Sequence, residues 1–260
     1  MVKALRSTQG TAPEGLAEDV LVGIGLVDSW TEIDGPIGPL FVAWSETTGI
    51  TAAERSGDPD GFETEYELRH GRPLRRVEAM PARLRSQVQK RFEGERTTGP
   101  RIDLDTLTEF ERAVLLKTME IPYGEVRPYS WVAREIGRPR AVRAVGSALA
   151  GNPITFVIPC HRVVRADGHI GDYGAGGPEA KREVLELEGI DVEALERTAG
   201  AGVRYTGSDS TSIYCYPSCR HARRTSARHE VRFRSAEEAR DAGYRPCKVC
   251  RPLEGTPFAA

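Results

Sequence analysis

A cysteine and a histidine stand side by side in the Pro-Cys-His-Arg-Val sequence at residues 159–163, directly after the apolar run at 154–158. The β-branched and aromatic residues of that run predict a strand, so Cys160 and His161 are expected where a strand ends. A histidine that accepts the thiol proton leaves Cys160 as a thiolate, the nucleophilic form of cysteine. The pattern therefore predicts a thiolate nucleophile, and Arg162 next to it favours a polyanionic target.

Two other interpretations of Cys160 stay open from these residues alone. Cysteine is often a buried structural residue. A cysteine–histidine hydrolase would use the same pair, but it also needs an oxyanion hole and a distant orienting group. The sequence gives no signal for either of these.

Two close cysteine pairs near the other end of the chain predict a metal site. Their spacing is typical of zinc ligands, and four thiolates complete a closed tetrahedral site. His221 and His229 lie between the pairs and could also bind metal, and two disulfides are the alternative. The total of five cysteines is odd, which favours a reducing cytoplasm over a disulfide framework. The expected ligands of a single Zn²⁺ are Cys215, Cys219, Cys247 and Cys250.

Positive charge is concentrated where these cysteines lie. The 260-residue chain has a net charge of -2 and 39% hydrophobic residues, and it contains no apolar run long enough to span a membrane. Between residues 127 and 165 there is one acid against seven arginines, and residues 201–252 carry 11 basic and 5 acidic residues. Surface arginine is the ordinary explanation, but the coincidence with both cysteine groups favours a phosphate backbone as partner. The seven are Arg127, Arg134, Arg138, Arg140, Arg143, Arg162 and Arg165.

The sequence also predicts where helices and strands begin and end around these residues. Residues 20–27 and 40–44 are predicted strands, and residues 81–92 a helix. A second helix is predicted over 108–119, with Thr108 and Glu111 as its capping box. Helices over 129–136 and 139–150, joined by a glycine-containing turn, are similar to a helix-turn-helix. In the second of these, small residues around Arg143 fit either a close approach to a groove or tight internal packing.

Several segments in order along the chain strongly resemble the O6-alkylguanine-DNA alkyltransferases. The match runs from about residue 103 to 189, and residues 34–50 resemble the N-terminal strands of that family more weakly. The segments that carry it are 121–126, 129–130, 143–146, 151–153, 158–164 and 171–174. The resemblance implies direct-reversal repair, in which the protein takes an alkyl group from guanine O6 in double-stranded DNA and is consumed after a single turnover.

The resemblance also implies roles for individual residues. Cys160 would be the nucleophile, His161 and Glu188 would activate it, and Asn152 would fix the turn before it. Arg143 would fill the gap left by a flipped nucleotide, and Tyr129 would rotate the phosphate and donate a proton. The residues expected to contact the DNA or the base are Arg143, Arg162, Val163, Tyr173, Gly174 and Lys181.

Residues 205–252 resemble the metal-binding domain of Ada, which takes a methyl group from DNA phosphotriesters onto its first cysteine. Here that cysteine would be Cys215. Tyr216 replaces the arginine usual at the next position, and similar zinc modules on nucleases only bind. Cys215 is therefore either a second methyl acceptor or a structural zinc ligand, and both interpretations stay open.

The predicted architecture has an α/β RNase H-like N-terminal layer, a winged helix-turn-helix alkyltransferase domain and a small α+β zinc module. Their predicted limits are residues 20–100, 101–195 and 203–254, after a disordered segment at 1–19. We expect a cytoplasmic, monomeric DNA-repair methyltransferase with no organic cofactor and no membrane contact. The competing hypothesis is a non-catalytic sensor that binds alkylated DNA and recruits other repair factors.

Overall fold

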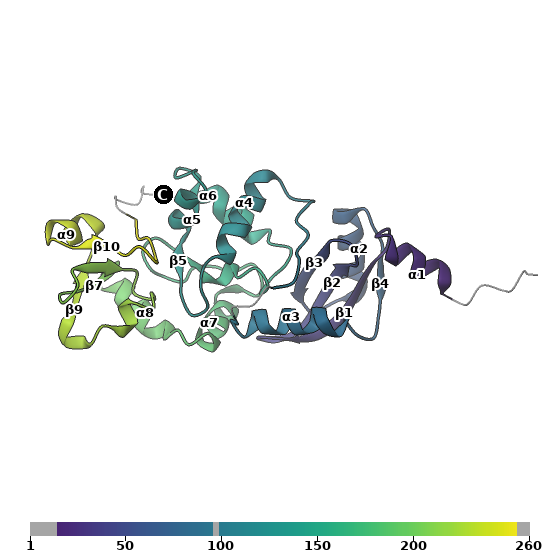
Figure 1. Cartoon of the computed structure of the whole chain (residues 1–260), viewed down its shortest axis with the longest axis horizontal. Helices are drawn as coiled ribbons and strands as arrows, with labels where there is room; N and C mark the ends of the chain where they lie inside the picture. The colour runs from purple at the N-terminus through teal and green to yellow at the C-terminus, as the bar shows by residue number, and fades with distance from the viewer. Residues whose placement is uncertain (1–14, 96–98, 254–260) are drawn as a thin grey trace, which may run out of the picture.

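A computed structural model of the chain describes residues 15–95 and 99–253. Three bodies follow one another along the longest axis, with the N-terminal sheet at one end and the C-terminal module at the other (Figure 1). Among the described residues, no helix is both long and apolar enough to cross a membrane.

The N-terminal body is a mixed four-stranded sheet with helices packed against it. The strand order is β3-β2-β1-β4, in which β1 pairs antiparallel with β2 and parallel with β4. Its elements are α1 (Leu16–Gly23), β1 (Asp28–Gly35), β2 (Gly38–Ser45), β3 (Gly49–Arg55), α2 (Pro59–His70), β4 (Leu74–Arg76) and α3 (Ala82–Phe92).

Two predictions for this body met different outcomes. The helix predicted over 81–92 is confirmed as α3. The strand predicted over 20–27 is wrong: its first half belongs to α1, which begins at Leu16 within the 1–19 segment, and its second half is turn and bend. Residues 1–14 of that segment lie outside the described residues. The first strand is instead β1, whose Trp30 is fully buried.

The central body carries the cysteine–histidine pair on short elements. The capping box of Thr108 and Glu111 is confirmed, with Thr108 Oγ1 accepting from the Glu111 backbone N–H. A two-stranded parallel ladder joins β5 to β6, directly after the pair. The elements are α4 (Glu109–Met119), β5 (Arg127–Pro128), α5 (Tyr129–Glu135), α6 (Val142–Ala150), a 3₁₀ turn (Cys160–Arg162), β6 (Val163–Val164), α7 (Gly177–Leu187) and α8 (Val192–Gly200).

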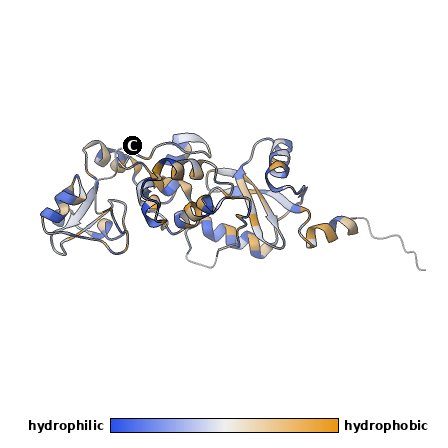
Figure 2. Cartoon of the chain, turned by 90° about the horizontal axis from the view of Figure 1, so that it is seen from above, coloured by the Kyte–Doolittle hydropathy of each residue, from blue (hydrophilic) through white to orange (hydrophobic). Residues whose placement is uncertain are grey.

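The C-terminal module is a second four-stranded sheet, of order β10-β8-β7-β9. In Figure 2 hydrophobic residues gather on the N-terminal strands and the central helices, whereas this module is mostly hydrophilic. So small and polar a body needs a further stabilising element. It contains β7 (Tyr205–Ser208), β8 (Ile213–Cys215), β9 (Glu230–Phe233), α9 (Ala236–Asp241), β10 (Arg245–Pro246) and two 3₁₀ turns (Ala222–Arg224 and Ala227–His229).

Candidate active site and metal centre

Cys160 is presented by a tight turn, so the strand predicted over 154–158 is wrong. Only isolated bridges occur there, and Phe156 has a φ of 67°. Asn152 fixes this turn at both ends: its Oδ1 accepts from the Ile154 N–H at 3.1 Å, and its Nδ2 donates to the Ile158 carbonyl at 3.1 Å. A left-handed backbone in a non-glycine residue is strained and persists where its surroundings hold it. The apolar residues are buried as expected, but in a turn that aims Cys160.

The thiol of Cys160 is buried, with 7% of the residue exposed. Asn152 Nδ2 donates to its sulfur at 3.2 Å. Burial raises the pKa of Cys160, and this effect outweighs the Asn152 hydrogen bond and the positive charge of Lys181, which lower it. Because the free thiol is favoured at neutral pH, a nearby base must take its proton before the sulfur can attack.

His161, the next residue along the chain, is the candidate for that base. Its Nε2 lies 2.8 Å from Glu188 Oε1, whereas its buried Nδ1 has no hydrogen-bond partner among the described residues. Burial lowers the pKa of His161 more than the neighbouring carboxylate raises it, so the ring is neutral at pH 7. With Nε2 as the donor to Glu188, Nδ1 carries the lone pair that can accept a proton.

Glu188 follows the last residue of α7 and is bound from three sides. Besides His161, the Arg162 guanidinium contacts it at 2.8 to 3.0 Å and the Gly124 N–H donates to Oε2 at 2.9 Å. Burial opposes its charge, but the His161 hydrogen bond and the Arg162 ion pair lower the pKa of Glu188 to about 2. The site therefore holds a permanent carboxylate behind the imidazole.

Arg162 is buried inside the protein, although the sequence predicted a contact with DNA. It is 5% exposed, and its Nη1 also donates to the Ile121 carbonyl at 2.8 Å. The charge of this arginine is paired with Glu188, and its contact with DNA stays a prediction.

Lys181 is fully buried beside the 3₁₀ turn. Its Nζ donates to the carbonyls of Val163 and Ile170, both at 2.7 Å, and lies 6.0 Å from the centre of the Tyr129 ring. Burial lowers the pKa of Lys181 to about 8. The carbonyl of Val163, one of the residues expected to contact the DNA or the base, accepts the hydrogen bond from Lys181.

Tyrosine rings form part of the surroundings of Cys160. Tyr173 is buried, with its ring centre 6.2 Å from that of His161. Burial, and then the charge of the Cys160 thiolate, raises the pKa of Tyr173 and also that of half-buried Tyr129. Both phenols therefore stay protonated and can donate hydrogen bonds.

A pocket of about 600 Å³ opens at Cys160, and part of its lining comes from residues that the sequence did not indicate. Asn152 and Gly174 line it, as the predicted roles require. Arg55, at the end of β3, and Arg69, in α2, also line it. These two arginines are about a hundred residues from Cys160 in the sequence, and only the fold brings them together.

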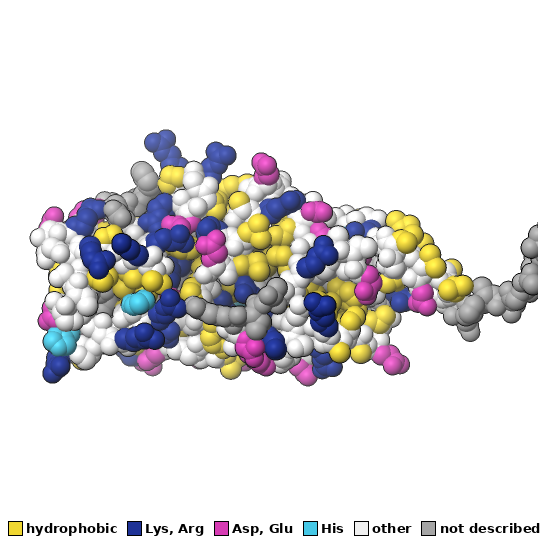
Figure 3. Space-filling model, in the orientation of Figure 1, with side chains coloured by type: hydrophobic (Ala, Val, Ile, Leu, Met, Phe, Trp, Pro, Cys, Tyr) yellow, Lys and Arg dark blue, Asp and Glu magenta, His cyan; other side chains and the backbone are white. Residues whose placement is uncertain are grey.

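Arg143 lies on the exposed face of α6. Ala144, Ser147 and Ala150 are exposed on the same helix, whereas Ala148 is buried. The buried small residue fits tight internal packing, and the exposed small residues on the opposite face fit a close approach to a groove. Lys and Arg side chains gather over α5, α6 and the C-terminal module on the face shown in Figure 3.

The four C-terminal cysteines converge as predicted. Their sulfur atoms all lie within 4.8 Å of one another, and all four residues are buried. A tetrahedral zinc–thiolate site, with Zn–S bonds of about 2.3 Å, has sulfur–sulfur distances of about 3.8 Å, so the group fits zinc. Hydrogen bonding with Cys215 lowers the pKa of Cys219 and raises that of Cys250, as expected where four acidic groups crowd together without a counter-charge. Neither His221 nor His229 belongs to the cluster.

A second basic pocket, of about 490 Å³, borders this cluster. Cys215 and Cys247 line it together with Arg224, Arg245 and Lys248. The three cations place positive charge beside the sulfur that the sequence singled out as a second candidate acceptor.

Comparisons with known proteins give matches for both the region around Cys160 and the C-terminal module. The family described as 6-O-methylguanine DNA methyltransferase, DNA binding domain, matches residues 109–190, and the metal binding domain of Ada matches residues 194–253. The chain is 38% identical over 164 residues to the methylated-DNA–protein-cysteine methyltransferase of Mycobacterium leprae, which covers 60% of this chain and 89% of that protein. The enzyme of the same name from Mycobacterium tuberculosis H37Rv is 39% identical over 159 residues, with the same coverage.

A solved structure agrees with the sequence matches. The crystal structure of Mycobacterium tuberculosis OGT in complex with DNA is similar to this chain with a TM-score of 0.51 and 33% identity. The similar region covers 65% of this chain and 99% of that one.

Proposed function

The chain belongs to the methylated-DNA–protein-cysteine methyltransferases, and on that premise we propose that Cys160 takes the alkyl group from O6-alkylguanine in DNA. The observation that carries this assignment is the line of groups from Asn152 through Cys160 to the His161–Glu188 pair, beneath an open pocket. Direct-reversal repair by such a transfer uses the protein once, because a thioether has no easy route back to a thiol.

The proposed reaction begins with proton transfer. The Cys160 proton moves to Nδ1 of His161, directly or through one water, and the Glu188 carboxylate stabilises the imidazolium that forms. The thiolate attacks the alkyl carbon, a sulfur–carbon bond forms, and the bond from that carbon to guanine O6 breaks. The electron pair stays on the leaving guanine, to which Tyr129 donates a proton, with Lys181 close enough to its ring to support the phenolate.

Double-stranded DNA is the proposed substrate carrier. The reacting carbon lies inside the base stack, so the nucleotide must leave the stack to reach Cys160. We propose that α5 and α6 act as a winged helix-turn-helix, that the small exposed face of α6 enters the groove, and that Arg143 occupies the space left by the base. The proposal also keeps an RNase H-like description for the N-terminal sheet, and Tyr173 and Gly174 as walls of the base pocket.

The C-terminal module is proposed to hold one Zn²⁺ through its four cysteines. Bound zinc would keep the four sulfurs as thiolates and supply folding free energy to a module with little apolar core. The basic pocket beside Cys215 favours the acceptor role over a purely structural one. In that role the Cys215 thiolate attacks the methyl carbon of a phosphotriester, and the phosphodiester anion leaves.

Peptide mapping by mass spectrometry tests both assignments. The zinc-loaded protein is incubated with duplex DNA carrying O6-methylguanine and, separately, with DNA carrying methyl phosphotriesters. We expect one added methyl on Cys160 from the first substrate and one on Cys215 from the second. DNA binding without methyl on Cys160 would instead support a non-catalytic sensor, and an unmodified Cys215 would make the module a binding element only.

Oligomeric state and cellular location are proposed from the same residues. We propose a monomer, because one chain supplies every group of the Cys160 site. A cytoplasmic location is proposed because five unpaired cysteines need a reducing compartment.

A further inference from the structure

Residues 124–131 join the two chemical centres. At one end of this segment the Gly124 N–H donates to Glu188, the carboxylate behind His161. Further along the segment, Tyr129 begins α5 beside the Cys160 pocket. A shift of this short stretch would therefore move groups next to His161, the proposed proton acceptor, and would move Tyr129, the proposed proton donor.

The C-terminal module holds the middle of this segment by buried polar contacts. The Val126 N–H donates to Ser218 Oγ at 2.9 Å, and the same hydroxyl donates to the Val126 carbonyl at 3.2 Å. The Arg220 N–H donates to Glu125 Oε1 at 3.2 Å. Ser218 and Arg220 flank Cys219, so one member of the cysteine cluster lies between two contacts with the segment.

Trp131 makes the second connection, from α5 to the other half of the cluster. Its indole N–H donates to the carbonyl of Cys250 at 3.0 Å, and the residue is 2% exposed. The guanidinium of Arg251 lies 5.5 Å from the centre of the indole ring and also pairs with Glu135 at 2.9 Å. A buried indole has one donor and a large free-energy penalty when that donor is unpaired.

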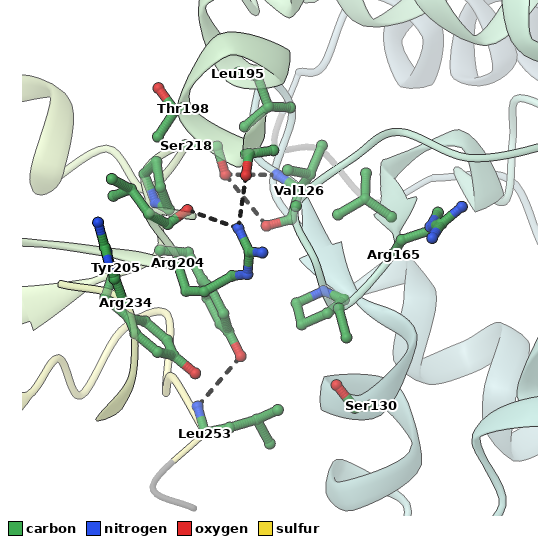
Figure 4. Close-up of a pocket in the computed structure, with 18 of the residues that line it drawn as sticks. Val126, Ser130, Arg165, Leu195, Thr198, Arg204, Tyr205, Ser218, Arg234 and Leu253 are labelled. Atoms are coloured by element: carbon green, nitrogen blue, oxygen red, sulfur yellow. Dashed lines mark hydrogen bonds between the residues drawn. The ribbon is translucent and has the colours of Figure 1, made fainter. Parts of the chain in front are cut away.

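Apolar packing accompanies these polar contacts, because Trp131 belongs to the same buried core as Tyr205 and Tyr216 of the module. A pocket of about 200 Å³ interrupts this packing, with Val126 and Ser130 on one side and Tyr205 and Leu253 on the other (Figure 4). The hydrogen bonds of Ser218, Arg220 and Cys250 add a fixed geometry to this interface.

From these contacts we propose that Trp131 is a positioning residue through which metal occupancy of the cysteine cluster sets the rate of alkyl transfer at Cys160. The inference rests on the proposed function. Metal binding fixes the backbone of residues 247–250, since such sites form only when the ligands fold around the ion. Loss of the metal releases the Cys250 carbonyl, leaves the Trp131 N–H unpaired and loosens α5 together with the Gly124–Glu188 hydrogen bond.

The test compares the full chain loaded with Zn²⁺ and after stripping with a chelator. Amide hydrogen exchange is measured without DNA, and methyl transfer is measured in single turnover at saturating O6-methylguanine duplex. We expect stripping to speed exchange at Gly124 and Val126, and to slow transfer about tenfold or more, the usual effect of losing such a supporting contact. The amides of β1 and β2 serve as the internal reference, because they lie in the N-terminal sheet.

Trp131→Phe keeps an aromatic ring but removes the N–H. The zinc-loaded variant is expected to exchange and react like the stripped native chain, with little further effect of stripping. Trp44→Phe is the matched control: that buried indole donates to Glu46 in the N-terminal body, so its removal should preserve the metal dependence. A thermal unfolding midpoint above the assay temperature shows that the Trp131 variant is folded.

Two results would overturn the inference. One is unchanged exchange at Gly124 and an unchanged transfer rate after stripping. The other is a metal dependence in Trp131→Phe equal to that of Trp44→Phe. If the zinc-loaded native chain does not methylate Cys160 at all, the proposed function fails, whereas the exchange data still decide whether the two centres are linked.

Discussion

His161 and Glu188 form a buried pair in which the carboxylate holds one ring nitrogen at 2.8 Å and leaves the other, Nδ1, as an acceptor. The pair resembles the histidine–carboxylate half of a hydrolase triad, in which the acid orients and stabilises the base. Here Arg162 neutralises part of the carboxylate charge. Burial and the nearby charge of Arg162 lower the pKa of His161 more than Glu188 raises it, so the ring is neutral at pH 7.

Replacing the carboxylate tests this arrangement. Glu188→Gln should lower the single-turnover rate of methyl transfer about a hundredfold, because the imidazolium loses its counter-charge and Arg162 loses its partner. Binding of the duplex should change little, since Glu188 is buried. Glu183→Gln, an exposed residue of the helix α7 that precedes Glu188, is the matched control and should react at the native rate. Equal rates for the two variants would remove Glu188 from the mechanism.

Acid should weaken the protein through the same residue. The pKa of Glu188 is lowered in the folded protein from its usual 4.5 to about 2, so its stabilising contribution is present above pH 4.5 and is lost as the pH falls toward 2. The shift corresponds to about 3 kcal/mol. Urea unfolding of the native chain and of Glu188→Gln should show a stability difference that narrows over that range. A constant difference between pH 6 and pH 2.5 would contradict the lowered pKa.

Arg143 should matter for duplex DNA and not for a free base. Arg143→Ala is expected to slow transfer from O6-methylguanine in a duplex by one to two orders of magnitude, because opening the stack costs roughly a few kcal/mol. Benzyl transfer from free O6-benzylguanine needs no opening, so its rate should be unchanged. Arg197→Ala, an exposed arginine of α8 paired with Glu193, is the control for loss of charge. A similar loss on both substrates would place Arg143 in the pocket chemistry instead.

The cysteine cluster should contain one zinc ion per chain. Elemental analysis is expected to give one Zn²⁺ for the native chain and for Cys160→Ser, and much less for Cys247→Ser. Chelation should also make four thiols reactive toward a disulfide reagent. A native chain that lacks metal and keeps the same unfolding midpoint with and without added Zn²⁺ would exclude a structural site.

The sequence predicted helices and metal ligands better than it predicted the backbone around Cys160. The capping box of Thr108 and Glu111 is local, so its two residues alone were enough to start α4 correctly. Likewise, the spacing of the cysteines was enough to predict that their four sulfur atoms lie close together. Periodicity failed at 154–158, where apolar residues pack in a turn that Asn152 supports, because a short buried run looks the same as strand or turn.

Long-range partners were the other limit. Arg162 pairs with Glu188 across 26 residues, and only the fold shows that both side chains are buried together. Arg55 reaches the Cys160 pocket from a separate sheet, and no local pattern could indicate this. The family resemblance is confirmed by the comparisons, whereas the roles of individual side chains remain proposals.

The docking of the C-terminal module on α5 also affects solubility. Trp131, Val126 and Tyr216 are buried, and the first two lie beneath or beside residues of the module. A chain ending near residue 200 would expose an indole and apolar residues next to α5, a surface prone to self-association. Proteolytic cleavage or a premature stop there is therefore expected to yield a fragment that aggregates instead of a free-standing repair domain.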